Sequence, residues 1–387
     1  MTRRHRIVFV IGSLREGGAE GQLLHLAHGL RSRGWRVSIM LLRSEGARLE
    51  AAQREGLPIF HVGLPRFRPL WNPVPWLRLL SCWRRSAQHL ARERPHVLHA
   101  WLFWAHLWAW LILPAARGAA FVTSRRQTWS DVPASAPIRW IARRIDKAST
   151  LVIANARAVA EVAMEGNPAI RRKLRVIPNG IDLAAISAAN AADLRAEFPS
   201  LRDCTTIAIT VANLLPHKGY EDLIEAWRTV AIQHPEAGIV CIGADGGMQR
   251  DLQRRIDKFR LGKRVVLAGP RAEVIPLLKG ADFAVHASRD EGFSNAVLEY
   301  LACGLAVVAT RAGGTAEAVE DGVTGFLCPV ASPAELALAI QRILESPSRR
   351  VMGARAAEEM RRRYPLARMV IRHERVYTTL VQERKQR

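Results

Sequence analysis

The sequence is poor in the residues that build metal sites and disulfide frameworks. Its 387 residues include five cysteines, an odd number that is scattered along the chain without C-x-x-C spacing. Such cysteines are typical of free buried thiols in a reducing cytoplasm, and they exclude a disulfide-framed secreted fold and a zinc ribbon. Neither D-x-D nor H-E-x-x-H occurs. We therefore expect no metal site.

Long hydrophobic runs are also absent. The apolar run near the amino terminus is short and leads into Gly12, which suits a first strand better than a secretion signal. Residues 99–116 are apolar but contain His99, His106 and Pro114, a pattern that predicts a strand end and a buried helix rather than a membrane span. No zinc-finger, RNP or helix-turn-helix signature is present, so nucleic acid is not an expected partner.

Acidic residues are scarce in the first half of the chain. Residues 1–183 carry 29 Lys and Arg against 11 Asp and Glu, an excess of 18, whereas residues 184–364 carry 22 of each. A basic excess confined to one domain favours an anionic membrane surface as its partner, and we expect a peripheral location on the inner face of the cytoplasmic membrane. A basic surface that only aids solubility is the alternative.

Tryptophan and arginine alternate in one part of this basic half. Seven of the eleven tryptophans lie in residues 57–116. Indole rings at headgroup depth with guanidinium groups on phosphates are typical of an interfacial patch, and a core helix with a basic face is the alternative. The residues that form the proposed patch are Arg66, Arg68, Arg78, Arg84 and Arg85, beside Trp71, Trp76 and Trp83.

Residues 284–310 carry the strongest pattern in the chain, because strand, loop, helix and strand signals follow one another. An apolar run ends at a polar break over residues 288–292, and Ser294 is a good N-cap for a helix that begins at Asn295. Gly304 suits the position after the helix, and residues 306–310 suit a buried parallel strand. The stretch predicts a β-α-β unit.

Two carboxylates lie in this unit. Glu291 precedes the helix and Glu299 lies in its second turn, so both can face the crevice at the carboxyl end of the strand. The bare N–H groups of the helix start form an anion site, and Gly292 allows a phosphate to approach the backbone. Carboxylates beside an anion site suit a nucleotide sugar. Solvated charges at a helix start are the alternative.

Both halves of the chain repeat strand and helix signals. A strand over residues 6–12 leads through Gly17 and Gly18 into a helix over residues 19–33, and these glycines either cradle a phosphate or form a plain turn. Arg125 and Arg126 follow a strand, where we expect solvent exposure or, alternatively, contact with an acceptor phosphate.

The second half contains a candidate phosphate ligand. A strand over residues 206–212 is followed by Asn213 and then by Lys218, a point charge beside a helix start that suits a diphosphate. Arg271 follows a strand over residues 265–267, where backbone groups could contact a nucleobase. A solvated loop lysine is the alternative for Lys218 considered by itself.

Several of these motifs together resemble those of a known family. Ser288, Glu291-Gly292-Phe293, Glu299 and Ala302-Cys303-Gly304 resemble the E-x7-E signature of the family-four glycosyltransferases. Residues 17–20 resemble their amino-terminal glycine loop, and residues 176–182 resemble their hinge. The resemblance implies an α/β chain of two Rossmann-like domains facing across a cleft, the GT-B fold. The acceptor-side domain would span residues 1–183, the donor-binding domain residues 184–364, and a final helix over residues 365–387 would return to the first domain.

The resemblance also implies a reaction. A sugar would pass from a nucleotide-diphosphate sugar to a glycan or lipid-linked acceptor with retention of configuration, in cell-envelope polysaccharide or glycolipid synthesis, without cofactor or metal. A nucleotide-sugar epimerase or hydrolase of the same fold and a non-enzymatic basic membrane-binding module are the alternatives. Asn213 occupies the position where the family usually has Arg. Stabilisation of the diphosphate charge would therefore depend more on Lys218. The expected catalytic residues are Lys218, Glu291 and His106, and the expected donor-binding residues are Gly17, Gly18, Asn213, Lys218, Arg271, Glu291, Gly292, Phe293, Ser294, Asn295 and Glu299.

Overall fold

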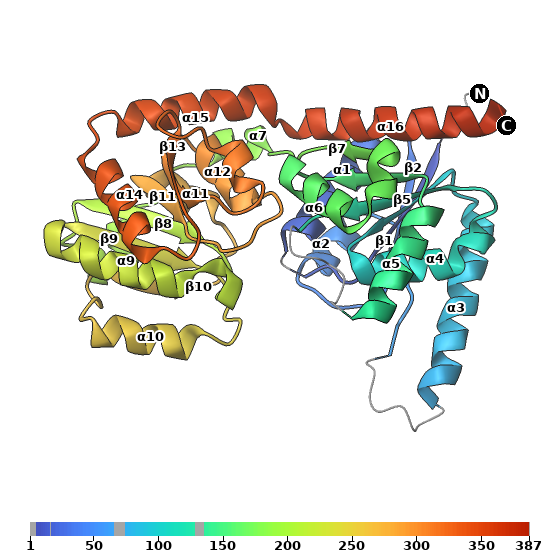
Figure 1. The fold of residues 1–387 in the computed structure, drawn as a ribbon, viewed down its shortest axis with the longest axis horizontal. Helices are drawn as coiled ribbons and strands as arrows, with labels where there is room; N and C mark the ends of the chain where they lie inside the picture. The colour runs from blue at the N-terminus through green and yellow to red at the C-terminus, as the bar shows by residue number, and fades with distance from the viewer. Residues whose placement is uncertain (1–4, 16, 66–73, 128–134, 387) are drawn as a thin grey trace. The chain divides into compact units, whose positions relative to one another are not determined.

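Two parallel sheets organise the chain. The computed structural model describes residues 5–15, 17–65, 74–127 and 135–386, and it divides into two compact units (Figure 1). Unit 1 comprises Met1–Gly180 and Leu366–Arg387, and unit 2 comprises Ile181–Pro365. The boundaries expected from the sequence follow residues 183 and 364.

Unit 1 contains a seven-stranded sheet in the order β3-β2-β1-β4-β5-β6-β7, with every neighbouring pair parallel. Its strands are β1 (Arg6–Ile11), β2 (Arg36–Leu41), β3 (Ile59–His61), β4 (Val97–Trp101), β5 (Ala120–Arg125), β6 (Leu151–Ala154) and β7 (Leu174–Val176). Its helices are α1 (Gly18–Ser32), α2 (Arg48–Arg54), α3 (Val74–Glu93), α4 (Phe103–Ile112), α5 (Ala136–Ala148), α6 (Arg157–Gly166) and α16 (Leu366–Gln386), with short 3-10 turns η1 (Leu113–Ala116) and η2 (Pro168–Lys173).

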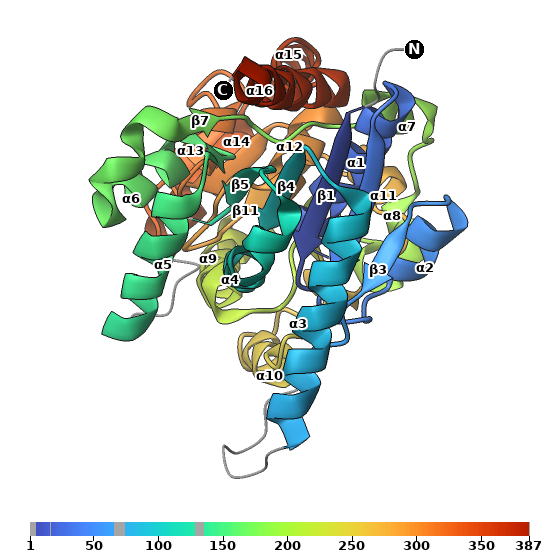
Figure 2. The ribbon, with the colours of Figure 1, turned by 90° about the vertical axis from the view of Figure 1, so that its right-hand side faces the viewer.

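Each face of this sheet has its own apolar core. The β1 run is buried over Ile7–Ile11 because both faces are covered, which explains why it is apolar throughout rather than alternating. One core joins the sheet to α1 and α16, and the other joins it to α3, α4 and α5. Figure 2 shows these helices and strands from the side of unit 1. The expected return of the last helix to the first unit is confirmed, since α16 packs against α1.

Unit 2 contains a six-stranded sheet in the order β10-β9-β8-β11-β12-β13, again with all neighbouring pairs parallel. Its strands are β8 (Thr206–Val211), β9 (Ala237–Ile242), β10 (Val265–Gly269), β11 (Phe283–His286), β12 (Val307–Thr310) and β13 (Gly325–Cys328). Its helices are α7 (Leu183–Ala188), α8 (Leu194–Glu197), α9 (Tyr220–Gln233), α10 (Gln249–Lys258), α11 (Ile275–Gly280), α12 (Asn295–Ala302), α13 (Thr315–Ala318), α14 (Pro333–Glu345) and α15 (Arg349–Arg363), with short 3-10 turns η3 (Pro199–Leu201) and η4 (Pro216–Lys218).

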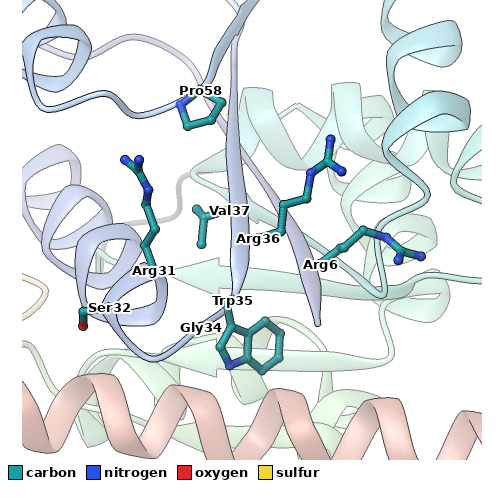
Figure 3. Close-up of a pocket in the computed structure, with 8 residues that line it drawn as sticks. All are labelled: Arg6, Arg31, Ser32, Gly34, Trp35, Arg36, Val37 and Pro58. Carbon is teal, nitrogen blue, oxygen red and sulfur yellow. The ribbon is translucent and has the colours of Figure 1, made fainter. Parts of the chain in front are cut away.

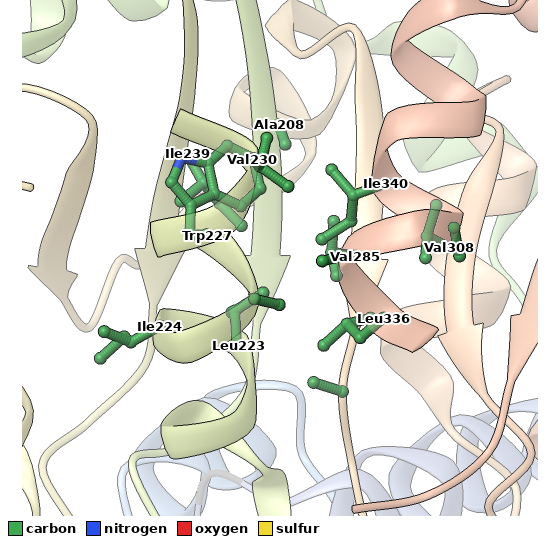
Figure 4. Packing of buried hydrophobic residues seen from close by; sticks show 14 of the residues in the cluster. Ala208, Leu223, Ile224, Trp227, Val230, Ile239, Val285, Val308, Leu336 and Ile340 are labelled. Carbon is green, nitrogen blue, oxygen red and sulfur yellow. The ribbon is translucent and has the colours of Figure 1, made fainter. Parts of the chain in front are cut away.

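The core of unit 2 fixes the helix that follows its first strand. Leu223, Trp227 and Val230 recur along α9 at helical spacing and are buried against the sheet. Leu336 and Ile340 of α14 pack into the same cluster (Figure 4). The start of α9, and with it the loop that precedes it, is therefore held in place by a rigid apolar contact.

The α/β expectation and the β-α-β unit over residues 284–310 are both confirmed. The observed β11, α12 and β12 match the expected strand, helix and strand, and Ser294 is the N-cap of α12 as predicted. The short elements α2 and β3 were not anticipated, and β3 depends on pairing with β2.

Candidate active site

The candidate site of unit 2 lies where the strand order reverses. β8 is the first strand of its sheet in sequence, with β9 on one side and β11 on the other. In open parallel sheets, ligands bind at such switch points, beside the carboxyl ends of the strands. Lys218 follows β8 and Glu291 follows β11. The topology therefore brings two residues that are 73 positions apart to one edge of the sheet.

A glycine allows the two loops to touch. Gly219 has φ +69°, and a Cβ atom at this position would lie 2.0 Å from the carbonyl oxygen of Ala287. The N–H of Arg289 also donates to the carbonyl of His217 at 2.8 Å. Only a residue without a side chain permits this approach, so the sequence Lys218-Gly219 places the ammonium group directly beside the loop that carries Glu291.

Three donors converge on the Glu291 carboxylate. Its Oε1 accepts from Lys218 Nζ at 2.6 Å, from His286 Nε2 at 2.9 Å and from Ser288 Oγ at 2.8 Å. Burial alone would raise the pKa of Glu291, but the hydrogen bond and charge of His286 and the charge of Lys218 outweigh it and hold that pKa well below its ordinary value. Glu291 is therefore ionised at neutral pH in a largely buried position.

An ion pair and a tyrosine support this arrangement from behind. Arg289 donates to both carboxylate oxygens of Asp222, with Nε at 2.8 Å and Nη2 at 2.7 Å, and so fixes the loop after β11 to the first turn of α9. The hydroxyl of Tyr300 on α12 accepts from the N–H of Val211 at 2.5 Å. Both contacts fasten the loop and α12 to the elements that carry Lys218.

The start of α12 is built as the sequence predicted. Ser294 Oγ accepts from the N–H of Val297 at 3.4 Å, and the carbonyl of Gly292 accepts from the N–H of Gly314 at 2.8 Å. Phe293 is buried with its ring centroid 5.4 Å from that of Tyr364. Asn295 and Glu299 lie on α12 with half-buried side chains. The helix start thus lies next to the Lys218 and Glu291 pair, with its positive end toward the strand edge.

Two of the expected donor residues lie elsewhere in unit 2. Asn213 is exposed, and its Oδ1 accepts from the N–H of Ala244 at 3.2 Å. Arg271 follows β10, the edge strand, where its Nε lies 3.4 Å from Glu197 Oε1 and its guanidinium lies 5.7 Å from the Phe198 ring.

The expected residues of unit 1 gather at its own switch point, between β1 and β4. Gly17 is the N-cap of α1 and Gly18 is its first residue, and a Cβ atom on Gly17 would meet the Glu20 carboxylate at 2.2 Å. His106 is fully buried in α4, where burial lowers the pKa of its imidazole well below the ordinary value. The enclosed ring has no exposed surface in this conformation, and a catalytic role for His106 stays a prediction.

The expectation of solvent exposure for Arg126 is wrong. Its side chain is 7% exposed, donates to Asn179 Oδ1 at 2.6 Å and lies 3.8 Å above the Trp101 ring. Burial lowers the pKa of Arg126 to about 9. No carboxylate pairs with it among the residues that the structure describes. Arg125 instead pairs with Asp146 at 2.5 Å and is also largely buried.

Sequence reasoning missed His286 and the pair of Arg289 with Asp222. His286 stands at the end of β11, two positions before Ser288, so the alternation of strand side chains was the available signal that both share a face. Nothing in the sequence indicates that Asp222 on α9 meets Arg289, because this contact depends on the pairing of β8 with β11.

The described residues contain no cluster of three or more His, Cys, Asp or Glu side chains suited to a metal ion. Over the same residues, no helix combines the length and the hydrophobicity that a bilayer span requires.

Two family profiles match the chain, and together they cover both units. The family described as Glycosyltransferase Family 4 matches residues 16–185, and the family described as Glycosyl transferases group 1 matches residues 196–360. The second match contains Lys218, Glu291 and Glu299.

Among curated relatives, the N-acetyl-alpha-D-glucosaminyl L-malate synthase of Bacillus anthracis is 26% identical over 215 residues, which cover 55% of this chain and 56% of that protein. The D-inositol 3-phosphate glycosyltransferase of Segniliparus rotundus is 26% identical over 328 residues, which cover 74% of this chain and 72% of that protein. The chain therefore spans little more than half of the first relative and nearly three quarters of the second.

Solved structures share the fold over nearly the whole chain. The Anabaena protein HepE, in complex with UDP, has a TM-score of 0.82 at 23% identity and covers 97% of this chain and 100% of its own. The sucrose-phosphate synthase of Thermosynechococcus elongatus has a TM-score of 0.80 at 19% identity, with 98% and 100% covered. These likenesses show the GT-B fold of two Rossmann-like domains.

Proposed function

Because this chain belongs to the family-four glycosyltransferases, we propose that it transfers a sugar from a nucleotide-diphosphate sugar to an acceptor, with retention of anomeric configuration. The observation that carries the proposal is the buried, ionised Glu291 held by Lys218, His286 and Ser288 in front of the α12 amino terminus. A fixed carboxylate next to a fixed cation and a helix start suits a ligand that has both hydroxyl groups and phosphates.

Lys218 is assigned to the diphosphate. Its ammonium group has three N–H donors, and the bond to Glu291 uses one of them, which leaves two for phosphate oxygens. As the bond to the sugar breaks, negative charge grows on the leaving diphosphate, and a cation already in position stabilises that charge without reorganisation. The first N–H groups of α12 act in the same direction. We propose that no divalent ion and no cofactor take part.

The two carboxylates receive different roles. Glu291 is oriented by three donors and lies beside Lys218, so we assign it to hydroxyl groups of the transferred sugar, close to the bond that breaks. Glu299 lies in the second turn of α12, and we assign it to the ribose. The sugar centre becomes oxocarbenium-like during transfer, so contacts near Glu291 strengthen in the transition state, whereas the ribose contacts stay constant.

On the acceptor side, we propose a glycan carried on an anionic lipid. A buried arginine without a carboxylate partner destabilises the folded protein, because its charge is desolvated, unless an anion binds to it. Among the described residues, Arg126 is such an arginine. It follows β5 at the carboxyl edge of the unit 1 sheet. A phosphate at the lipid end of the acceptor is a suitable partner.

A membrane face on unit 1 fits the same acceptor. Leu77 and Leu80 of α3, Trp104 of α4 and Trp140 of α5 are large apolar side chains with 48–69% of their surface exposed, and α4 contacts both neighbouring helices (Figures 1 and 2). Exposed arginines accompany them on these helices, namely Arg78, Arg84, Arg139, Arg143 and Arg144. Arginines beside exposed indoles are typical of helices that lie in the headgroup region. We propose peripheral binding to the inner face of the cytoplasmic membrane, in cell-envelope glycan or glycolipid synthesis.

The structure changes which residues belong to the predicted interfacial patch of arginines and tryptophans. Arg85 donates inward to the carbonyl of Val62 at 2.8 Å, so it contributes less to an outer surface than expected. Arg66, Arg68 and Trp71 lie outside the described residues, and the side chain of Trp76 is likewise not described. Trp104 and Trp140 were not part of the prediction, because only the adjacency of α4 and α5 with α3 reveals them.

A panel of UDP-, GDP- and ADP-sugars tests the donor assignment. A ligand present at a hundred times its dissociation constant adds about 2.7 kcal/mol to stability, so a true donor raises the melting temperature measurably. The stabilising donor is then incubated with a membrane lipid extract and without it. Transfer that depends on the extract supports the proposal. Equal consumption of donor without any acceptor would identify a hydrolase or an epimerase, and no stabilisation by any donor would reject the nucleotide-sugar site.

A further inference from the structure

The amino-terminal edge of the unit 1 sheet, opposite to the edge that carries Gly17 and Arg126, contains two adjoining hollows. The larger, of about 770 Å³, is lined by Arg6, Arg31, Ser32, Gly34, Trp35, Arg36, Val37 and Pro58 (Figure 3). The smaller, of about 340 Å³, is lined by Arg6, Arg94, Pro95, His96, Ala116, Arg117, Gly118, Val381 and Arg384. Arg6, the first residue of β1, lines both.

The smaller hollow is basic on every side. Four arginine residues line it, from the start of β1, the end of α3, the turn after η1 and the end of α16, and none of the described residues in its lining is Asp or Glu. Within the described residues, no carboxylate pairs with Arg6, Arg94 or Arg117. Arg6 Nε donates to the carbonyl of Arg94 at 2.7 Å, a neutral acceptor that leaves the charge uncompensated. Four like charges brought together in a concave surface attract an anion strongly.

The backbone at two of these arginines is unfavourable for any residue except glycine. Arg94 has φ +45° and Arg117 has φ +43°, both in the left-handed region, where a Cβ atom crowds the following carbonyl. Each position directly follows a helical segment, which is where glycine is preferred. The chain carries arginine at both, and both line the same hollow. Arginine side chains at two strained backbone positions of one hollow indicate that their charges have a function there.

The larger hollow adds some apolar surface. Its lining includes the exposed Pro58 and the nearly buried Val37, and the side chains of Arg31 and Arg36 lie on either side of Val37 in Figure 3. These two arginines are partly engaged, Arg31 with the carbonyl of Gly56 at 2.7 Å and Arg36 with Glu93 at 3.2 Å. The two hollows together therefore offer cations for a phosphate and apolar surface for the group that carries it.

We propose that this edge is a second anion site, distinct from the donor site, which binds a phosphate group on a small molecule or on a lipid headgroup. Guanidinium groups from several elements match the several oxygens of a phosphate. The hollow lies at the opposite end of the parallel strands from the carboxyl edge, a separation of roughly 15–20 Å for a six-residue strand. Its ligand therefore does not take part in the transfer step.

The test compares matched arginine-to-glycine changes in the full chain. Inorganic pyrophosphate is titrated at constant ionic strength, and the melting temperature is followed in a Lys218→Ala background, which weakens the phosphate response of the donor site. Arg94→Gly combined with Arg117→Gly should leave the melting temperature without ligand unchanged or higher, because glycine relieves the left-handed backbone. The same pair should weaken pyrophosphate binding at least tenfold.

Arg260→Gly is the control, since Arg260 has φ +56° but lies in unit 2 and lines neither hollow. It should leave the pyrophosphate response unchanged. Cosedimentation with phosphatidylglycerol vesicles forms the second arm. Loss of vesicle binding in the double variant without a pyrophosphate response would identify the lipid headgroup as the source of the phosphate. If the double variant binds both pyrophosphate and vesicles as the parent does, or if neither probe binds the parent, the second anion site does not exist.

Discussion

The contact between Gly219 and Ala287 makes the position of Lys218 testable without touching a charged group. Replacing Gly219 with alanine places a Cβ atom 2.0 Å from the carbonyl oxygen of Ala287, whereas ordinary contact begins near 3.4 Å, so the loops must separate by roughly 1.4 Å. The left-handed backbone adds about 1–2 kcal/mol, and the overpacking adds about 1–3 kcal/mol. A displacement of this size next to the reacting atoms lowers the rate about 100-fold.

Gly269 provides a matched control. It has the same φ of +69°, but a Cβ atom there meets nothing within 4 Å. Gly269→Ala should therefore lower the free energy of unfolding, measured by urea denaturation, only by the cost of the left-handed backbone, about 1–2 kcal/mol. Its rate of donor turnover should equal that of the wild type. Gly219→Ala should be less stable than Gly269→Ala and about 100-fold slower. Equal stability and equal turnover in the two variants would show that the close approach of the loops is not what positions Lys218.

The remaining predictions concern the carboxylates, pH and the membrane. Glu299→Gln should weaken binding of the nucleoside diphosphate by calorimetry, while Glu291→Gln should lower kcat; unchanged affinity in Glu299→Gln would reject the ribose contact. Because the pKa of Glu291 is lowered in the folded protein, its contribution to stability is present above about pH 4.5 and is lost as the pH falls further. Urea unfolding at pH 6, 4.5 and 3.5 should show a steeper loss for the wild type than for Glu291→Gln, and parallel curves would contradict the assignment. Finally, replacing exposed arginines of the membrane face with Gln should abolish cosedimentation with anionic but not neutral vesicles at low salt. Each arginine contributes about 1 kcal/mol to binding near an anionic leaflet. Undiminished binding would show that these arginines form an ordinary solvated surface. The residues changed together are Arg78, Arg84, Arg139 and Arg143.

Local patterns predicted much of the fold. The apolar runs, the Ser294 cap and the turn glycines are local signals, and the expected β11, α12 and β12 agree with the structure to within about two residues. The short edge strand β3 was missed because its stability comes from pairing with β2 rather than from its own sequence.

The site was predicted less completely, for a physical reason. Lys218 and Glu291 each sit in a recognisable loop, yet their direct contact depends on β8 pairing with β11, which no local pattern specifies. The roles of His286 and Asp222 have the same origin. Arg126 was expected in solvent because arginine is usually exposed, and only the tertiary contact with Trp101 and Asn179 reveals its burial.

The most direct test of the account is the turnover of the stabilising nucleotide sugar by Lys218→Ala, because the central claim is that this ammonium group stabilises the leaving diphosphate. Loss of one such group costs about 2.7–4 kcal/mol of transition-state stabilisation, so kcat should fall by about 100- to 1,000-fold while the urea unfolding curve shows a folded protein. Lys263→Ala, an exposed change in the same unit, should retain wild-type turnover. Wild-type turnover in purified, folded Lys218→Ala would contradict the account.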